Sequence, residues 1–481
     1  MKRLPTSVPG LDTVLGGGLE PGSVTVVAGP PGTGKTILVQ QICFANATAG
    51  HRAIYYTTVS EPHTKLIRHL EPFSFFAPEK LGSQVDYIHL GDLIRNDEAG
   101  QIKALVTEVV RQASAEQPVL VVIDSAKALR DFSGQRELRL ALYDLTSRLA
   151  HTNAALLLVG EYTPGEIAAG AEFSLADSII QLAYEPREPV DRRWLRVIKM
   201  RGTRHLEGKH TFRITSDGVE VFPRIETIDA GEAADVTGRI PSGIPGLDAV
   251  MNGGISAGEA TVILGPSGAG KTIFGLNFVA EGLIRGERCL YVTFQDTADQ
   301  LTKMAAGFGW GLAEARASGQ LVVHHIPLGE LDLDMLTAHV RADLADGTVQ
   351  RVVFDSLAEL VFAARETERF PAYARSLIGL IRASGASLVI TSETTTLGPT
   401  HDPDGRGVTF LFHNLIQLRY IELNSVTGRA LNVVKMRNSN HRKDIYQFAI
   451  GDDGPVVGGR LEGVTGVLGW SVLRTTSTIT S

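Results

Sequence analysis

The sequence is poor in cysteine and has no long apolar run. Its 481 residues contain two cysteines, Cys43 and Cys289, which excludes a disulfide framework and a four-cysteine zinc site. No apolar stretch approaches the ~18 residues that cross a bilayer. Residues 1–5 do not lead into the apolar core of a secretory signal. We therefore expect a cytoplasmic protein that has no membrane partner.

The sequence also lacks a large excess of either positive or negative charge. Lys and Arg together number 46, Asp and Glu 53, and the net charge is −7. Proteins that coat nucleic acid or lie on anionic membranes are usually basic, so the overall charge favours neither class. Residues 187–213 are a local exception, with nine Lys or Arg against three acidic residues. This stretch keeps nucleic-acid binding open as an alternative.

Glycine is abundant in contrast, with 51 residues in the chain, and many of them mark an internal repeat. Residues 29–36 and 265–272 are two copies of one glycine-rich segment, 236 residues apart, and Lys-Met-Arg at 199–201 recurs at 435–437. The repeat predicts two domains, at residues 1–230 and 236–465, joined by a linker near residues 228–238. We expect the tail at residues 466–481 to be disordered.

Within each copy, apolar strands alternate with helical patterns. Continuous apolar strands separated by helices indicate a mainly parallel sheet covered on both faces, which is an α/β fold. In the first copy the predicted strands are residues 24–28, 53–59, 119–123 and 154–159, and the predicted helices include residues 36–48 and 137–150. Hairpin-like spacing of apolar runs at 178–184, 194–199, 210–214 and 219–222 predicts an antiparallel extension of the sheet.

Both glycine-rich segments satisfy the P-loop pattern G-x-x-x-x-G-K-[ST]. In this motif backbone N–H groups surround the phosphates of a nucleotide, the Lys supplies positive charge and the Ser or Thr hydroxyl ligates Mg²⁺. Two matches, each between a predicted strand and a helix, argue against coincidence. The predicted ATP-binding residues are Gly29, Pro30, Pro31, Gly32, Thr33, Gly34, Lys35 and Thr36, with Gly265, Pro266, Ser267, Gly268, Ala269, Gly270, Lys271 and Thr272.

A P-loop also needs a carboxylate at the end of a neighbouring buried strand to hold the metal. Asp124 and Asp355 follow such strands in the two copies, and the alternative role for each is a helix cap. With ATP and Mg²⁺ as the expected cofactors, the predicted metal ligands are Thr36, Asp124, Thr272 and Asp355.

ATP hydrolysis further needs a group that activates or orients water. The candidates after the second strand are Ser60-Glu61 in the first copy and Gln295-Asp296 in the second. A solvated turn that caps a helix is the alternative for both segments. Glu161 and Glu393, just after the fourth strand, are equally consistent with a contact to that water and with a loop cap.

Over nearly its whole length the sequence resembles the KaiC family of RecA-like ATPases, in its tandem two-domain form. The P-loops, the Asp-Ser after the third apolar strand and the Lys-Met-Arg segments carry the resemblance. It implies a RecA-like core and a hexameric ring with ATP between neighbouring subunits. It also implies that a group of cations reaches a neighbour's γ-phosphate, namely Lys199, Arg201, His205, Lys435, Arg437 and His441.

The chain departs from the family at the expected catalytic base. The family has two adjacent glutamates after the second strand and uses the first as the base, whereas this chain has Ser60 and Gln295 there. We therefore expect slow hydrolysis, with Glu61 and Asp296 as substitutes. The clock member also phosphorylates its own adjacent Ser-Thr pair; here that pair falls on Thr409 and Phe410, which leaves Thr409 as the one acceptor.

These observations favour a KaiC-like ATPase over the clock protein itself. The leading interpretation is an ATP-binding and ATP-hydrolysing homo-oligomer, a hexamer by resemblance, whose nucleotide state acts as a switch in signalling or assembly. The alternatives are a Ser/Thr autokinase and a DNA-dependent RecA-like ATPase. The last is disfavoured because residues 187–213 include the cations expected at a neighbour's ATP.

Overall fold

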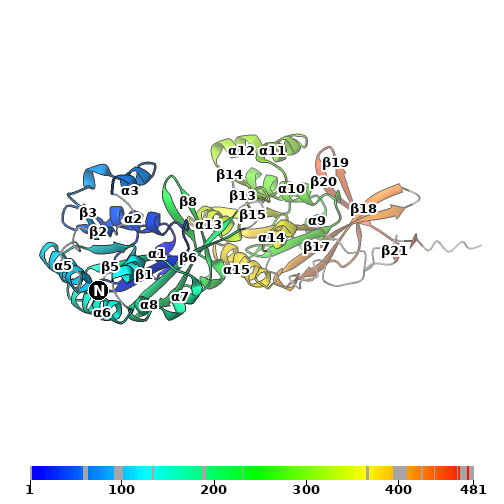
Figure 1. Cartoon of the computed structure of the whole chain (residues 1–481). Coiled ribbons are helices and arrows are strands. Elements are labelled where there is room, and N and C mark those ends of the chain that lie inside the picture. The colour runs from blue at the N-terminus through cyan, green and yellow to red at the C-terminus, as the bar shows by residue number, and fades with distance from the viewer. Residues whose placement is uncertain are drawn as a thin grey trace, which may run out of the picture. The chain divides into compact units, whose positions relative to one another are not determined.

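The computed structural model contains two compact units, Met1–Ile228 and Asp229–Ser481, each built around its own β-sheet (Figure 1). We describe each unit by itself. The residues that the structure describes are 3–57, 63–90, 101–132, 135–186, 191–229, 231–364, 368–393, 409–423, 426–437, 439–462, 464–465 and 474–475.

The first unit holds a nine-stranded sheet with the order β3-β2-β4-β5-β1-β6-β7-β8-β9. The six strands from β3 to β6 are parallel, and β7, β8 and β9 continue the sheet as antiparallel strands. Their bounds are β1 Val24–Gly29, β2 Ala53–Thr57, β3 Val85–His89, β4 Leu120–Asp124, β5 Ala155–Glu161, β6 Ser178–Glu185, β7 Arg192–Met200, β8 His210–Thr215 and β9 Gly218–Phe222.

The second unit repeats this topology with the order β14-β13-β15-β16-β12-β17-β18-β19-β20. The predicted fold class, a mainly parallel α/β sheet with an antiparallel extension, is therefore confirmed in both units. The bounds are β12 Ala260–Gly265, β13 Arg288–Thr293, β14 Leu321–His325, β15 Val349–Asp355, β16 Ser387–Glu393, β17 Asn414–Leu423, β18 Val426–Met436, β19 Tyr446–Gly451 and β20 Gly454–Arg460; β10 Arg239–Ile240 and β11 Ile255–Ser256 form a separate pair.

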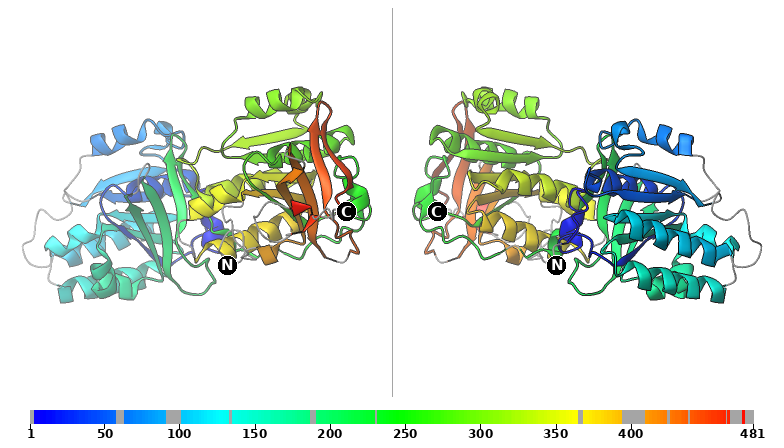
Figure 2. Two further views of the ribbon diagram at one scale, coloured as in Figure 1. Left: turned by 90° about the vertical axis from the view of Figure 1, so that its right-hand side faces the viewer. Right: turned by 90° about the vertical axis from the view of Figure 1, so that its left-hand side faces the viewer.

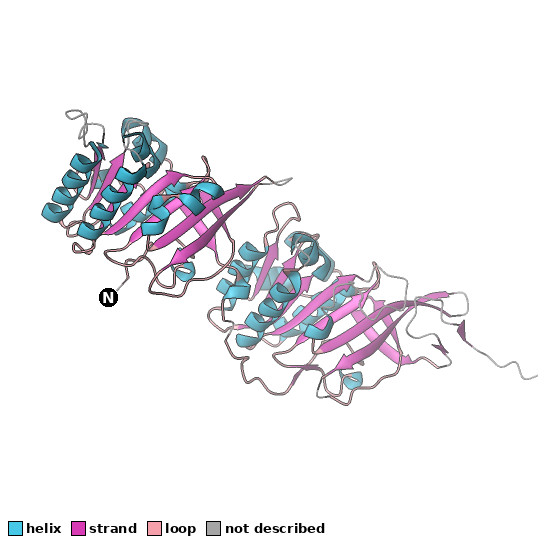
Figure 3. Cartoon of the chain, turned by 60° about the horizontal axis from the view of Figure 1, so that its bottom comes forward, coloured by secondary structure: helices cyan, strands magenta, loops and turns pink. Residues whose placement is uncertain are grey.

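Helices lie against the parallel part of each sheet (Figures 2 and 3), and the last antiparallel strands, β9 and β20, also pack against helices of their own units. The first unit contains α1 Leu11–Val14, α2 Lys35–Asn46, α3 His63–Leu70, α5 Gln101–Glu116, α6 Gln135–Leu149, α7 Pro164–Ala169 and α8 Ala171–Leu175. The second contains α9 Leu247–Val250, α10 Lys271–Ile284, α11 Ala298–Ala306, α12 Leu312–Ser318, α13 Leu333–Leu344, α14 Leu357–Ala364 and α15 Phe370–Ala383. Short 3₁₀ turns include Ala126–Phe132 and Thr409–Leu411.

Both faces of the first sheet are buried, which explains why its strands are continuously apolar. Successive residues of a strand point to opposite faces: Val27 and Val122 pack in the cluster around α2, while Val26 and Val121 pack in the cluster around α5 and α6.

Both cysteines are buried. Burial raises the pKa of the Cys43 thiol and raises that of Cys289 to about 12, so neither is a reactive thiolate at neutral pH.

Three regions add detail to the expectations. β3 was not singled out by its sequence, because the polar Asp86 and His89 interrupt the apolar pattern at this edge strand. In the predicted linker, the Ala234 N–H donates to the Arg382 carbonyl at 3.1 Å, which ties that part of the linker to the second unit. In the tail, β22 Arg474–Thr475 pairs with β21 Val464–Thr465; its other residues lie outside the described part. No described helix is both long and apolar enough to cross a membrane.

Candidate functional site

Each P-loop connects the end of a central strand to the start of a helix. β1 ends at Gly29 and α2 begins at Lys35; β12 ends at Gly265 and α10 begins at Lys271. The residues before the helices, Gly34 and Gly270, have φ of +93° and +104°, a left-handed conformation that favours glycine. A Cβ on Gly34 would also lie 2.5 Å from Cδ1 of Ile214. The glycines thus let the backbone N–H groups at the helix start face outward toward an anion.

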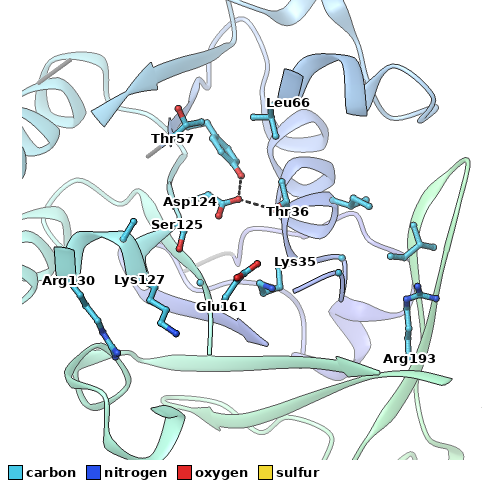
Figure 4. Close-up of a pocket in the computed structure, with 17 residues that line it drawn as sticks. Lys35, Thr36, Thr57, Leu66, Asp124, Ser125, Lys127, Arg130, Glu161 and Arg193 are labelled. Atoms are coloured by element: carbon cyan, nitrogen blue, oxygen red, sulfur yellow. Dashed lines mark hydrogen bonds between the residues drawn. The ribbon is translucent and has the colours of Figure 1, made fainter. Parts of the chain in front are cut away.

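A cavity of about 900 Å³ lies over the first P-loop (Figure 4). It is lined by residues from the P-loop, β2, β4, β5 and β7 and from the turn after β4. These include Gly32, Gly34, Lys35, Thr36, Tyr55, Thr57, Asp124, Ser125, Lys127, Arg130, Glu161 and Arg193. The second P-loop faces a cavity of about 410 Å³, whose lining includes Gly268, Gly270, Lys271, Thr272, Gln295, Asp296, Asp355, Ser356, Glu393 and Arg429.

The P-loop lysines are held inside these cavities by carbonyls of their own loops. Lys35 Nζ donates to the Pro30 carbonyl at 2.7 Å, and Lys271 Nζ donates to the Gly265 and Pro266 carbonyls at 3.0 and 2.9 Å. Burial lowers the pKa of both lysines, and nearby carboxylates, Glu161 for Lys35 and Glu393 for Lys271, oppose that effect. A phosphate in the cavity would favour the charged form further, so the residues present fit a polyphosphate ligand.

The predicted metal ligands of the first domain also meet at this edge of the sheet, and Thr272 and Asp355 of the second domain both line its cavity. The Asp124 Oδ2 atom accepts hydrogen bonds from Thr36 Oγ1 at 3.0 Å and from the Tyr55 hydroxyl at 2.6 Å. In the second domain, Asp355 accepts from the Tyr291 hydroxyl at 3.0 Å and from the Thr391 hydroxyl. Burial, with the adjacent aspartate, raises the pKa of both tyrosines well above 10, so both remain donors. A hydroxyl beside a carboxylate is a ligand set that suits Mg²⁺.

Other carboxylates line the same cavities. Glu161 lies beside Gly29 in the strand register, Glu393 lies beside Gly265, and the Glu161 side chain points toward Lys35 (Figure 4). Gln295 and Asp296 both line the second cavity. Ser60 and Glu61 lie outside the described residues.

The cations that the resemblance assigns to a neighbour's ATP lie away from their own P-loop. β7 runs antiparallel to β6, so Arg193 pairs with Tyr184 and Met200 pairs with Ser178. Ser178 lies beside Thr25, well before the P-loop end of β1. At about 3.3 Å per residue, Lys199 stands about 20 Å along the strand from Arg193. The second domain has the same arrangement, with Arg429 opposite Tyr420 and Met436 opposite Asn414.

At the opposite edge Lys199 and Arg201 are held by local partners. Lys199 Nζ donates to the Ala176 carbonyl at 2.5 Å, and Arg201 forms an ion pair with Asp177 at 3.5 Å. Burial lowers the pKa of Lys199 and of Lys435. His205 and His441 are half-buried. None of these residues, nor Arg437, is among those that line the described cavity of its own domain.

Sequence reasoning missed several residues that the fold brings to the cavities. Arg193 and Arg429 come from the antiparallel strands, and the strand register combined with the 236-residue offset could have identified them as equivalent. Lys127 and Arg130 line the first cavity, where they pair with Glu166 and Glu172 at 2.8 and 2.7 Å. Their position in the turn after β4 carries no motif that would reveal it.

The basic stretch considered for nucleic-acid binding is largely engaged within the domain. Arg192 donates to Thr211 Oγ1 at 2.8 Å, Lys209 pairs with Glu185 at 2.6 Å and Arg213 pairs with Glu220 at 2.7 Å. These contacts, and the position of Arg193 at the cavity, engage part of the basic stretch within its own domain.

Comparison with known proteins agrees with this geometry. The family model described as "ATPase: KaiC" matches residues 4–226 and again residues 240–462. The chain is 26% identical to the circadian clock oscillator protein KaiC of Parathermosynechococcus lividus, over 98% of this chain and 88% of the relative. It is also 26% identical to the circadian clock protein KaiC3 of Synechocystis sp., over 99% of this chain and 95% of the relative. The resemblance inferred from the sequence is confirmed.

The separate cavities predict that nucleotide can be removed from one domain at a time. Lys35→Ala should empty the first cavity and Lys271→Ala the second, because each lysine acts locally; the loss of one charged contact should weaken binding by about 1.5–3 kcal/mol, or roughly 10- to 150-fold. Titration with a fluorescent ATP analogue measures this, and the unaltered domain of each variant is the control. Loss of all nucleotide from either single variant would show that the two sites are obligately coupled.

Proposed function

Because the chain belongs to the KaiC family of ATPases, we propose that it is an ATP-hydrolysing homo-oligomer whose nucleotide state switches its conformation in signalling or assembly. The resemblance favours a ring of six subunits. The observation that carries the proposal is the position of Lys199 and Arg201, at the edge of the sheet opposite their own P-loop. From there these side chains serve a nucleotide held by another domain, which the resemblance assigns to the neighbouring subunit.

The chemistry of the proposed site is mainly electrostatic. Lys35 and Lys271 neutralise phosphate charge, and an arginine from the neighbour stabilises the charge that develops on the transferred phosphoryl group. Mg²⁺ bound by Thr36 with Asp124, and by Thr272 with Asp355, would supply further positive charge beside the phosphates. Glu61 and Asp296 are the proposed carboxylates for the attacking water, since Ser60 and Gln295 cannot take its proton at neutral pH.

A mixing experiment tests whether Arg201 acts in another subunit. Lys35→Ala disables a chain's own first P-loop, and Arg201→Ala disables the cation that it offers to a neighbour. Mixed rings contain interfaces that join an intact P-loop to an intact Arg201. About a quarter of the interfaces in an equimolar mixture are intact, so phosphate release should rise about fivefold or more above the mean of the two separate variants, if removing the arginine costs roughly 10³-fold and removing the lysine about tenfold or more. Every sample also carries Lys271→Ala, so that the second domain contributes equally to the phosphate release of each.

The control for this mixture is Arg204→Ala, an exposed arginine close to Arg201 with no proposed contact to ATP. It should hydrolyse ATP at the parent rate without mixing. Native mass measurement must show mixed oligomers with Mg-ATP present. A chain that stays monomeric at micromolar concentration, or mixed rings without any gain, would contradict action between subunits.

The two proposed carboxylates should differ in strength. Asp296 is one methylene shorter than Glu61, and a misplacement on the order of 1 Å can cost about a hundredfold in rate. We expect slow turnover overall, with a large loss in Glu61→Gln and a smaller loss in Asp296→Asn, as measured by steady-state phosphate release with nucleotide occupancy checked. If Glu61→Gln hydrolyses ATP normally, Glu161 and Glu393 become the candidates; a larger loss in Asp296→Asn would make the second domain the more active one.

A second candidate function is autophosphorylation at Thr409. The Arg437 guanidinium donates to the Phe410 carbonyl at 3.0 Å, and Lys435 Nζ donates to the Phe412 carbonyl at 2.8 Å. Arg437 is thus attached to the turn Thr409–Leu411 and Lys435 to the residue just after it. We propose both cations for a neighbour's γ-phosphate, and their closeness to Thr409 in the chain supports this candidate.

Phosphopeptide mass spectrometry after incubation with Mg-ATP tests the autokinase. Phosphate should appear on Thr409, disappear in Thr409→Ala and fall by about tenfold or more in Arg437→Ala, since removal of a charge-stabilising cation slows phosphoryl transfer. Thr427→Ala, at an exposed threonine of β18, is the control and should remain phosphorylated. Phosphate on other residues alone would remove this candidate.

A further inference from the structure

The second domain contains a buried carboxylate behind the position where the family has its catalytic base. Glu359 lies in the first turn of α14 and is 6% exposed. One of its oxygens, Oε1, accepts a hydrogen bond from Gln295 Nε2 at 2.5 Å. The other, Oε2, accepts from the Ser356 hydroxyl at 2.5 Å and from the Ser356 N–H at 3.2 Å.

These contacts decide which way the Gln295 amide faces. Glu359 is the acceptor in all three of these hydrogen bonds, and an accepting oxygen faces a donor. The atom of Gln295 that faces Glu359 must therefore be the nitrogen, and the amide oxygen lies on the other side of the group. Gln295 is exposed and lines the P-loop cavity, whereas Glu359 is not among the described residues that line it.

We propose that Glu359 is a positioning residue that fixes the Gln295 amide with its oxygen toward the P-loop cavity, where that oxygen orients the water that attacks ATP. This inference rests on the proposed ATPase function and assigns the water-orienting pair of the second domain. The water oxygen bonds to the γ-phosphorus as the bond from phosphorus to the β–γ bridging oxygen breaks, and ADP leaves with that electron pair. The proton that the water loses passes to the Asp296 carboxylate, since an amide cannot hold it.

The contact with Ser356 alone has a simpler explanation. Ser356 and Glu359 have the spacing of a capping box, in which a Glu at the third helical position bonds the residue that begins the helix. That role uses Oε2 and leaves Oε1 unexplained. The first domain supports a separate role, because Ala128 stands at the equivalent position, four residues after Asp124 as Glu359 is four after Asp355. The partner carboxylate therefore accompanies glutamine at the base position and is absent where the chain has Ser60-Glu61.

The test measures phosphate release from the full chain carrying Lys35→Ala, so that the second domain is observed alone. Glu359→Ala introduces the residue of the first domain and should lower kcat on the order of tenfold with KM unchanged, because the amide is free to rotate. In a Gln295→Ala background the same substitution should change nothing, since there is no amide left to orient. Asp332→Ala, which removes the cap of α13, is the control for loss of a helix cap and should keep kcat.

In a second pair of variants, removal of the Glu359 carboxyl group should raise kcat instead of lowering it. Gln295→Glu restores the family residue but sets two carboxyl groups against each other, so that one of them stays protonated. Adding Glu359→Ala to Gln295→Glu should therefore raise kcat by about tenfold and move the acid limb of its pH profile to lower pH. A role of Glu359 confined to the helix cap predicts that both variants containing Glu359→Ala lose activity.

The outcomes distinguish failure of the positioning role of Glu359 from failure of the proposed ATPase function. An equal loss of kcat with and without the Gln295 side chain, or no loss in Glu359→Ala, would overturn the positioning role while ATP hydrolysis stands. No phosphate release from the Lys35→Ala parent, with nucleotide bound in the second domain, would overturn both hydrolysis at this site and the inference. If Glu359→Ala does not fold, Glu359→Gln serves the same comparison, because its amide no longer requires a donor from Gln295.

Discussion

The direction of the strands decides what each domain can do. Six parallel strands end at one edge of the sheet, and the P-loop, the aspartate after β4 or β15 and the glutamate that ends β5 or β16 all lie there. The next strand runs the other way, so the segment Lys-Met-Arg at its end lies at the opposite edge. A domain built in this way holds a nucleotide at one edge and offers cations at the other. The chain is an ATP-binding member of the KaiC family, and this division places the two halves of the proposed ATP site at opposite edges of each domain.

The two domains have kept the same topology but changed the surroundings of the P-loop. The segment after β4 gives Lys127 and Arg130 to the first cavity, whereas the helix after β15 holds Glu359 against Gln295, outside the described residues that line the second cavity. The first is also the larger, at about 900 Å³ against about 410 Å³. The two P-loop sites of the chain therefore differ in size and in the residues that surround them.

Much of the fold and of the P-loop sites could be predicted from the sequence, because both depend on short motifs and on continuous apolar strands. The P-loops, Asp124 and Asp355 are each recognisable within a few residues of a buried strand, and the fold class follows from the alternation of apolar strands with helical patterns. Arg193 and Glu359 could not be found in this way. Arg193 reaches the cavity only through the register of β6 and β7, and Glu359 meets Gln295 across 64 residues of chain, so both depend on tertiary placement. The edge strand β3 is only partly buried, so its sequence mixes polar and apolar residues and gives a weak strand pattern.

The strand β7 has a mechanical consequence under the proposed arrangement. It is nine residues long, carries Arg193 beside the cavity of its own domain and carries Lys199 near its far end. β18 repeats this with Arg429 and Lys435. β7 pairs with β6 along nearly its whole length and with β8 at Trp194 and Leu195, so a shift of one end of the strand would be transmitted to the other end. In the proposed ring, each such strand would connect two successive nucleotide sites. The timing of hydrolysis at one interface would then depend on whether the interface before it holds nucleotide.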